Sequence, residues 1–314
     1  MNNSFLDFEK PIADIIDKID ALKVIVNENP DLRPQIIKLE EEEKRITKKV
    51  YSRLSAWQIV QVARHSKRPH TSDYISRIFS DFDEMHGDRM FGDDASIIGG
   101  VAYLEDEPVV IIGHQKGRDT EEKVKRNFGM PQPEGYRKAK RLMEFAEHFE
   151  LPLITFIDTS GAYPGIEGEE RGQSEAIARN LALMSELKTP ILVIVIGEGG
   201  SGGALALGVG DHISMLEYAT YSVASPEACS SIIWRSSENK SEAAEAMKIS
   251  AKELIKINVI DEIIQEPPGG AHREYDIAAE NIKSSLVQNL EKIKDMNKSD
   301  LLEKRYKKLQ NIGK

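Results

Sequence analysis

The residues in this sequence best suited to chemistry are glycines, which gather in the segment Ile191–Gly210 (ILVIVIGEGGSGGALALGVG). An apolar, β-branched run over 191–196 predicts a buried strand, and five of the seven residues from Gly197 to Gly203 are glycine. The run Ala204–Leu207 then predicts a buried helix start. Because glycine has no side chain, the backbone N–H groups at such a junction stay accessible. They can therefore bind an anion, or stabilise an oxyanion that forms in a transition state.

A second loop of this kind follows another predicted strand and reads DTSGAYPG over residues 158–165. Because the carboxyl ends of parallel strands lie at one edge of a sheet, we expect the two loops to meet there. The first loop would supply an amide from Gly161 or Ala162. The glycine segment would supply one from Gly202 or Gly203. Two such donors form an oxyanion hole, in which each donor contributes on the order of 3 kcal/mol.

Short motifs offer other interpretations of the same glycines. Residues 197–202 match the dinucleotide-binding pattern G-x-G-x-x-G, with Glu217 near the position of a ribose-binding acid. The helix after it is short and interrupted by glycine, which disfavours that interpretation. The phosphate-loop pattern is excluded because no Gly-Lys-Ser/Thr follows.

Two other enzyme classes, a serine hydrolase and an acyl-CoA hydratase, stay open at this point. Residues 199–203 match the G-x-S-x-G turn of serine hydrolases, with Ser201 as nucleophile. An acid and a histidine follow later in the chain, for example Asp261 and His272. An acyl-CoA hydratase would instead need a carboxylate beside the loops, and 167–170 supplies the nearby glutamates.

Two basic clusters are interpreted as solvated faces, with a dock for phosphates or for an acidic partner as the alternative. Their members are Arg64, His65, Lys67, Arg68 and His70 in the first cluster, and Lys116, Arg118, Lys123, Lys125 and Arg126 in the second. No spacing of His, Asp, Glu or Cys is typical of a metal site.

The elements that position these residues differ between the two parts of the chain. Over residues 1–60, apolar residues at helical spacing predict a helical hairpin, with a break at 29–31. Over 61–314, strands and helices alternate, which predicts an α/β domain with a mainly parallel, covered sheet. The strands are expected at 109–113, 153–158, 191–196, 213–216, 221–224 and 258–264, and the helices at 133–150, 172–187 and 275–309, the last as one helix or a pair.

Length, composition and charge limit the classes of protein that this sequence fits. A chain of 314 residues with 40% hydrophobic residues is ordinary for a globular protein, and its single cysteine, Cys229, suits a reducing cytoplasm. The net charge of -10 argues against general binding of nucleic acid. The first residues show no leader pattern, and no apolar run approaches the roughly 20 residues of a membrane helix. We therefore expect a cytoplasmic protein.

Long ordered stretches of the sequence resemble the α subunits of bacterial acetyl-CoA carboxylase carboxyltransferases. The resemblance runs from about Phe5 to about Tyr275 and includes FIDTSGAYPGIEGEERGQSEAIARNL and VIGEGGSGGALALGVGD. Further stretches are GHQKGRDTEEKVKRNFGMPQPEGYRKAKRLM, YSVASPEACSSIIW, FLDFEKPIADIIDKIDAL and AWQIVQVARHSKRPHTSDYI. The resemblance implies a crotonase-like fold, a spiral of ββα units, here with an N-terminal helical hairpin and C-terminal helices.

The resemblance also implies an activity and partners. Family members transfer the carboxyl group of carboxybiotin to acetyl-CoA, which gives malonyl-CoA for fatty acid biosynthesis. The α subunit works in an α2β2 assembly with a zinc-ribbon β subunit, together with biotin carboxyl carrier protein and biotin carboxylase. With one cysteine, this chain cannot be the zinc-bearing partner, so no metal is expected in it.

The site residues implied by the resemblance fall on the two loops. The α side of the shared site holds the biotin end. The oxyanion donors fall on Gly202 and Gly203, and Gly161 and Ala162 form the supporting loop. The biotin end is expected near Gly199, Gly200 and Ser201.

Overall fold

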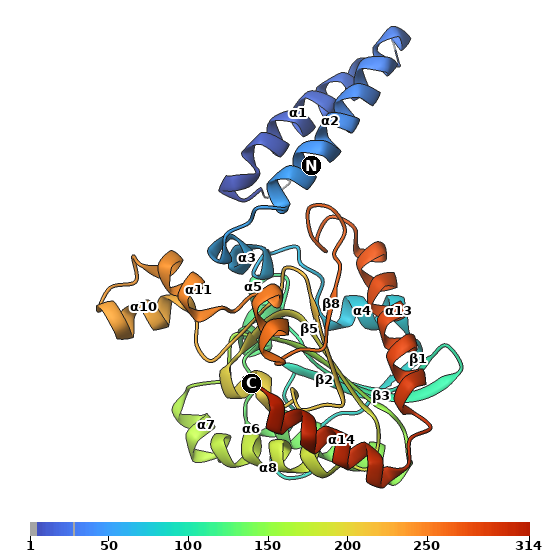
Figure 1. Ribbon diagram of the computed structural model, residues 1–314, viewed down its shortest axis with the longest axis vertical. Coiled ribbons are helices and arrows are strands. Elements are labelled where there is room, and N and C mark those ends of the chain that lie inside the picture. The colour runs from blue at the N-terminus through green and yellow to red at the C-terminus, as the bar shows by residue number, and fades with distance from the viewer. Residues whose placement is uncertain (1–4, 28) are drawn as a thin grey trace.

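An eight-stranded sheet forms the centre of the computed structural model, which describes residues 5–27 and 29–314 (Figure 1). The strand order is β1-β2-β3-β4-β5-β6-β8, and β7 pairs with the end of β5. The strands are β1 (Ser80–Glu84), β2 (Ile97–Leu104), β3 (Glu107–His114), β4 (Leu153–Thr159), β5 (Ile191–Gly200), β6 (His212–Leu216), β7 (Thr220–Ser222) and β8 (Glu262–Ile264).

The sheet is antiparallel at one edge and parallel elsewhere. β1, β2 and β3 pair in antiparallel fashion, whereas β3 through β6 and β8 run parallel. In register, Ile154 of β4 lies opposite Leu192 of β5, which lies opposite His212 of β6. Every residue of β4 is buried, as a parallel strand covered on both faces requires. The predicted α/β class with a mainly parallel, covered sheet is thus confirmed.

Helices cover the sheet and join its strands (Figure 1). Two helices precede the first strand, α3 (Ala56–Ala63) and α4 (Thr71–Ile78). Those between the strands are α5 (Thr120–Lys125), α6 (Pro133–His148), α7 (Ile166–Glu170), α8 (Gln173–Glu186), α9 (Ser201–Leu205), α10 (Pro226–Trp234), α11 (Lys240–Met247) and α12 (Ala251–Leu254). Short 3-10 turns are η1 (Asp7–Glu9), η2 (Pro30–Leu32), η3 (Asn127–Gly129) and η4 (Ile255–Ile257). Helix α6 turns Tyr136, Ala139, Leu142 and Met143 into the interior, which confirms the helix expected after residue 133.

The N-terminal segment forms a helical hairpin that projects from the body (Figure 1). Helices α1 (Lys10–Ile25) and α2 (Arg33–Tyr51) pack through Ile15, Ile19 and Ile36. The predicted hairpin is therefore present, although residues 1–4 and 28 lie outside the described part. The boundary between domains at residue 60 stays a prediction.

The C-terminal segment is a pair of helices, one of the two arrangements expected for 275–309. These are α13 (Tyr275–Ile293) and α14 (Lys298–Asn311). Two strand predictions were too long, because β7 covers 220–222 and β8 covers only 262–264. Asn258 adopts a left-handed conformation (φ 57°) at the end of η4, so the chain cannot be extended there. Among the helices described, none is both long and apolar enough to cross a membrane.

Candidate active site

The glycines from 197 to 203 were expected to form a turn, but they belong to a strand and to the start of a helix. Strand β5 continues through Gly200, and helix α9 begins at Ser201 rather than at Ala204. Gly199 lies in the ladder, opposite Thr159 of β4 and Tyr221 of β7. The apolar pattern stops at Ile196, but glycine leaves the backbone free to pair on both sides, so the strand extends past it.

The two loops meet at the carboxyl ends of β4 and β5, as expected from parallel strands. A Cβ atom on Gly200 would lie 2.2 Å from the carbonyl oxygen of Ser160. One on Gly203 would lie 2.6 Å from the amide nitrogen of Ala162 and 2.6 Å from the carbonyl carbon of Gly161. No side chain fits at either position, so these glycines are required by the close approach of the two backbones.

The amides at this junction are not equally available. The Gly161 amide donates to the Thr159 hydroxyl at 3.1 Å, so it is already occupied. Within the described residues, no acceptor takes the Ala162 amide hydrogen. Gly202 and Gly203 are the second and third residues of α9, where the amides lack acceptors inside the helix. Of the loop residues named from the sequence, Ala162 rather than Gly161 thus offers a donor beside Gly203.

Gly202 differs from Gly200 and Gly203 because no other backbone of this chain occupies the space that a side chain would take. A Cβ atom there would meet only Ile177, at 3.7 Å, which is ordinary van der Waals contact. Its φ angle does not require glycine either. Inside a helix, glycine is less stable than alanine by about 1 kcal/mol. Nothing in the packing of this chain therefore explains why position 202 is glycine.

A network of largely buried charged side chains connects the strand ends beneath the two loops. The Lys116 ammonium lies 2.7 Å from Asp158 and 3.1 Å from Glu198, and the Glu198 amide donates to Asp158 at 3.0 Å. Burial opposes the charge on Lys116, but the carboxylates of Asp158 and Glu198 raise its pKa to about 12. Glu198 also accepts from Arg64 at 2.6 Å. This network fixes the strand ends from which both loops leave.

Ion pairs correct the interpretation of the basic clusters as solvated faces for some of their members. Arg68 is buried and pairs with the equally buried Glu266 at 2.6 Å. Arg118 pairs with Asp73, and Lys116 is held as described above. Arg68 and Lys116 are therefore neutralised within the fold, whereas Lys67, Arg118 and Lys125 stay exposed on its surface, as the solvated-face interpretation expects. Sequence alone missed this because the partner carboxylates lie far away along the chain.

Two buried side chains beneath the loops were missed in the sequence. His114 ends β3 and is fully buried against the backbone of Gly203 and Phe156, and burial lowers its pKa to about 4, so the ring is neutral. The Tyr136 hydroxyl lies 3.0 Å from the Cβ position of Gly203. The only signal for His114 was its place at the end of an apolar strand.

The structure does not assemble the alternative sites. Ser201 has the strained φ of +53° expected of a nucleophile turn. However, Asp261 accepts from the Ile213 amide and from Lys308, while His272 stacks on His65 with ring centroids 3.9 Å apart. The triad predicted for a hydrolase is therefore absent from the described residues.

The other two alternatives also lack support. The glutamates of α7, at positions 167, 169 and 170, are exposed to solvent, and none of them forms a hydrogen bond to the glycine junction. The dinucleotide interpretation fails because residues 197–200 belong to a strand and α9 is only five residues long.

Comparison with known proteins places the chain in a family. The sequence profile of the acetyl co-enzyme A carboxylase carboxyltransferase-like family matches residues 5–313. The acetyl-coenzyme A carboxylase carboxyl transferase subunit alpha of Pseudoalteromonas atlantica is 56% identical over 317 residues, covering 100% of this chain and 99% of the relative. The same subunit of Chromohalobacter salexigens is 57% identical over 314 residues, with the same coverage.

Solved structures with a similar fold include a transcarboxylase, a carboxylase subunit and a malonate decarboxylase. Transcarboxylase 12S aligns with a TM-score of 0.55 at 20% identity, covering 71% of this chain and 44% of that chain. The β subunit of Pseudomonas aeruginosa geranyl-CoA carboxylase aligns with a TM-score of 0.57 at 15% identity, covering 81% and 45%. A Pseudomonas malonate decarboxylase hetero-tetramer gives 0.57 at 17% identity, covering 68% and 86%. The chain thus spans less than half the length of the first two.

The solved structures show that the fold is crotonase-like, and the family profile and the full-length relatives place the chain among carboxyltransferases. The chain belongs to the acetyl co-enzyme A carboxylase carboxyltransferase-like family, so the resemblance read from its sequence is confirmed.

Proposed function

We propose that this chain is the α half of an acetyl-CoA carboxylase carboxyltransferase, which transfers the carboxyl group of carboxybiotin to acetyl-CoA and so forms malonyl-CoA. Full-length relatives at 56–57% identity carry that subunit name, which supports the assignment. In this proposal the active site lies between this chain and a zinc-ribbon β partner in an α2β2 assembly. Carboxybiotin arrives on a separate carrier protein that a biotin carboxylase loads, and the assembly works in the cytoplasm.

The observation that carries the proposal is the open space at Gly202. This position has room for a Cβ within its own chain and yet is glycine. Glycine there leaves the amides at the start of α9 accessible to a molecule approaching from outside. A ligand oxygen brought against these amides supplies the missing reason for the residue.

The chain's part in the reaction is electrostatic. When bound, carboxybiotin would supply the carboxyl group and a ureido oxygen on which negative charge grows as that group leaves for acetyl-CoA. The amides of Gly202 and Gly203, with the unpaired amide of Ala162 beside them, would donate to that oxygen. They act most strongly as the charge appears, which lowers the barrier rather than merely tightening binding. Gly199, Gly200 and Ser201 line the approach, and Gly161 holds the supporting loop in a conformation (φ 150°) that glycine alone readily adopts.

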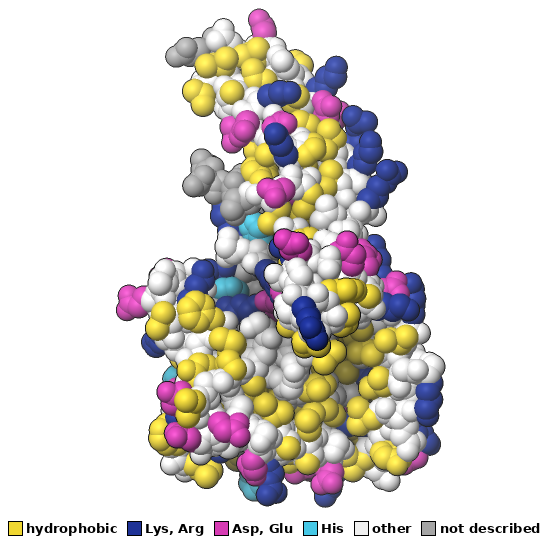
Figure 2. Space-filling view, turned by 90° about the vertical axis from the view of Figure 1, so that its left-hand side faces the viewer, with side chains coloured by type: hydrophobic (Ala, Val, Ile, Leu, Met, Phe, Trp, Pro, Cys, Tyr) yellow, Lys and Arg dark blue, Asp and Glu magenta, His cyan; other side chains and the backbone are white. Residues whose placement is uncertain are grey.

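In this proposal the β partner docks on an exposed apolar patch. Val223 is 80% exposed and Ile232 is 78% exposed, and Leu205 of α9 itself is 43% exposed. The space-filling view faces the side that bears α10, and hydrophobic side chains gather on it (Figure 2). A partner that covers this patch would also close the site beside α9.

Reconstitution tests the proposal. The purified chain should convert acetyl-CoA to malonyl-CoA at a negligible rate when given carboxybiotin. Addition of a zinc-ribbon β subunit from a relative's organism should restore turnover. Substantial transfer by the lone chain, or no transfer after a stable complex has formed, would contradict the shared site.

A further inference from the structure

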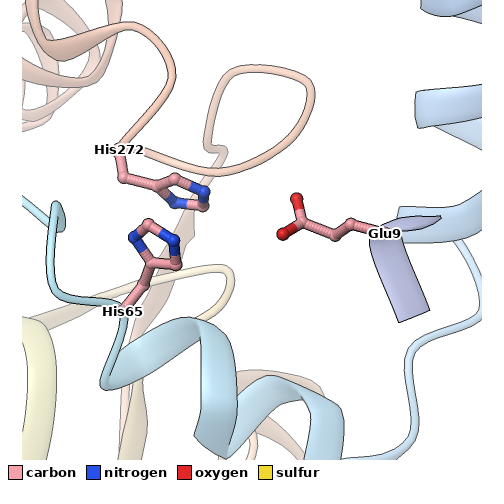
Figure 3. A group of neighbouring side chains, drawn as sticks. All are labelled: Glu9, His65 and His272. Carbon is pink, nitrogen blue, oxygen red and sulfur yellow. The ribbon is translucent and has the colours of Figure 1, made fainter. Parts of the chain in front are cut away.

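Three side chains from distant parts of the sequence converge where the hairpin meets the body (Figure 3). Glu9 lies in η1, His65 follows α3, and His272 precedes α13. All three are buried, and their ligand atoms lie within 4.8 Å of one another. We propose that Glu9, His65 and His272 form a binding site for a divalent transition metal, with Zn²⁺ as the preferred ion.

The burial of His272 and its lack of hydrogen bonds support its role as a metal ligand. The residue is 8% exposed, and within the described residues neither of its ring nitrogens has a hydrogen-bond partner. A buried imidazole without partners forfeits hydrogen bonds that water would have supplied. Since neither nitrogen is engaged by a described residue, a ring nitrogen is available to bind a metal.

Glu9 keeps capacity for one more interaction. Its Oε1 accepts from the Tyr51 hydroxyl and from Arg273, each at 2.8 Å, and its Oε2 accepts from the Leu6 amide at 2.8 Å. A carboxylate has about four acceptor positions, so one remains on Oε2. Figure 3 shows the carboxylate pointing toward the two imidazole rings.

The donor set determines the class of ion. Two imidazoles and one carboxylate suit zinc with a fourth position left to water, and they also accept cobalt and nickel. Calcium and magnesium are disfavoured because they prefer oxygen ligands. A cavity of about 370 Å³ lined by Phe5, Leu6, His65 and Ser66 gives the ion a path to the site.

Binding requires a small rearrangement of the rings. The imidazoles of His65 and His272 are stacked, with an interplanar angle of 24°. A metal lies in the plane of each ring it binds, at about 2.0–2.1 Å from nitrogen. The stack must therefore open by rotation of His272, whose nitrogens hold no hydrogen bond that would resist it. Arg273 competes with the ion for Glu9, so it weakens the site.

Metal binding would join the hairpin to the body. Glu9 belongs to the segment that leads into α1, whereas both histidines belong to the body. An ion shared by these ligands would restrain the hairpin's base. This inference is independent of the carboxyl transfer proposed above, since it involves neither glycine loop.

Direct measurement on the full chain tests the site. The purified chain, stripped with a chelator, should take up one Zn²⁺ per chain in equilibrium dialysis with elemental analysis. Co²⁺ should give the visible absorption of a tetrahedral or five-coordinate site. Zn²⁺ should also raise Tm. Wild-type protein that binds less than a small fraction of one ion per chain would overturn the proposal, whatever the variants do.

Variants assign the ligands. His272→Ala should weaken Zn²⁺ binding by more than about tenfold, as should Glu9→Gln, because removal of a ligand costs at least as much as removal of its supporting group. Arg273→Gln should tighten binding. His148→Ala removes an exposed histidine on α6 and serves as the control with unchanged affinity. Wild-type affinity in a folded His272→Ala variant would show that the ion binds elsewhere.

Discussion

At the scale of single residues, the junction of β5 and α9 contains glycines of two kinds. Gly200 and Gly203 are glycine because another backbone occupies the space of a side chain. Gly202 has that space available. Substitutions at these positions should therefore separate stability from activity, since a side chain at 203 disrupts the loops and one at 202 does not.

Ser201 provides a test of stored strain. Its φ of +53° lies in the left-handed region, which costs a residue other than glycine or asparagine about 1 kcal/mol. Ser201→Gly should raise the free energy of unfolding by up to about 1 kcal/mol, as measured by urea denaturation, and should leave carboxyl transfer nearly unchanged. A large loss of transfer in this variant would instead favour a chemical role for the hydroxyl.

At the scale of elements, the C-terminal helix is anchored by one buried ion pair. Arg305 of α14 and Asp211 are both fully buried, and the guanidinium donates twice to the carboxylate, at 2.9 and 2.7 Å. It also donates to the carbonyls of Leu187 and Thr189. One side chain thus ties α14 to the loop after α8 and to the start of β6.

Removal of this anchor should be costly. Arg305→Ala leaves the Asp211 carboxylate buried without its partner, so we expect a loss of about 3–5 kcal/mol in the free energy of unfolding. Lys307→Ala, which removes an exposed pair with Glu303 on the same helix, should cost less than about 1 kcal/mol. Equal losses in the two variants would contradict the assigned role of burial.

Glu262 of β8 should make stability depend on pH. The hydrogen bond from His212, together with those from Ser285 and Ser214, lowers the pKa of Glu262 to about 2 against the opposing effect of burial. Since the folded-state pKa lies below the ordinary value of 4.5, the stabilisation is complete above that value and is lost as the pH falls toward 2.

The matching variant is Glu262→Gln. It should lower Tm at neutral pH, and the loss should become smaller at about pH 3, where the ionised carboxylate is less favoured. Thermal melts followed by circular dichroism at both pH values measure the difference. A loss of the same size at both would mean that ionisation of Glu262 is not involved.

At the scale of the whole molecule, the apolar patch around α10 is the surface that an assembly should bury. Ile232→Asp places a charge where the partner is expected, so it should weaken association with the β subunit by more than about tenfold. Val24→Asp, at an equally exposed apolar position on the hairpin, is the matched control. Sedimentation of the mixed subunits measures both, and unchanged association of Ile232→Asp would exclude this surface.

Much of the fold follows from sequence patterns, for identifiable reasons. The run 191–196 and the apolar face of α6 predicted their elements because burial imposes a period of two or of 3.6 on apolar residues, or a continuous run. The extension of β5 through Gly197–Gly200 was missed because glycine carries no such pattern. The resemblance to a family supplied the fold name and the activity, which no local pattern could supply.

Only part of the candidate site could be predicted from the sequence. The meeting of the loops followed from the rule for parallel strands. The hydrogen bond that occupies the Gly161 amide did not, because it depends on the rotamer of Thr159. The cluster of Glu9, His65 and His272 was also missed, since tertiary packing alone brings these residues together.

The most direct test of the account is carboxyl transfer by Gly202→Val in the complex with a β subunit. The account predicts that the complex still assembles with nearly unchanged Tm, because a side chain at 202 meets only Ile177. It predicts a turnover at least about 100-fold below wild type, the effect of losing an oxyanion donor. Wild-type turnover in the assembled variant would contradict the claim that these amides face the reacting oxygen.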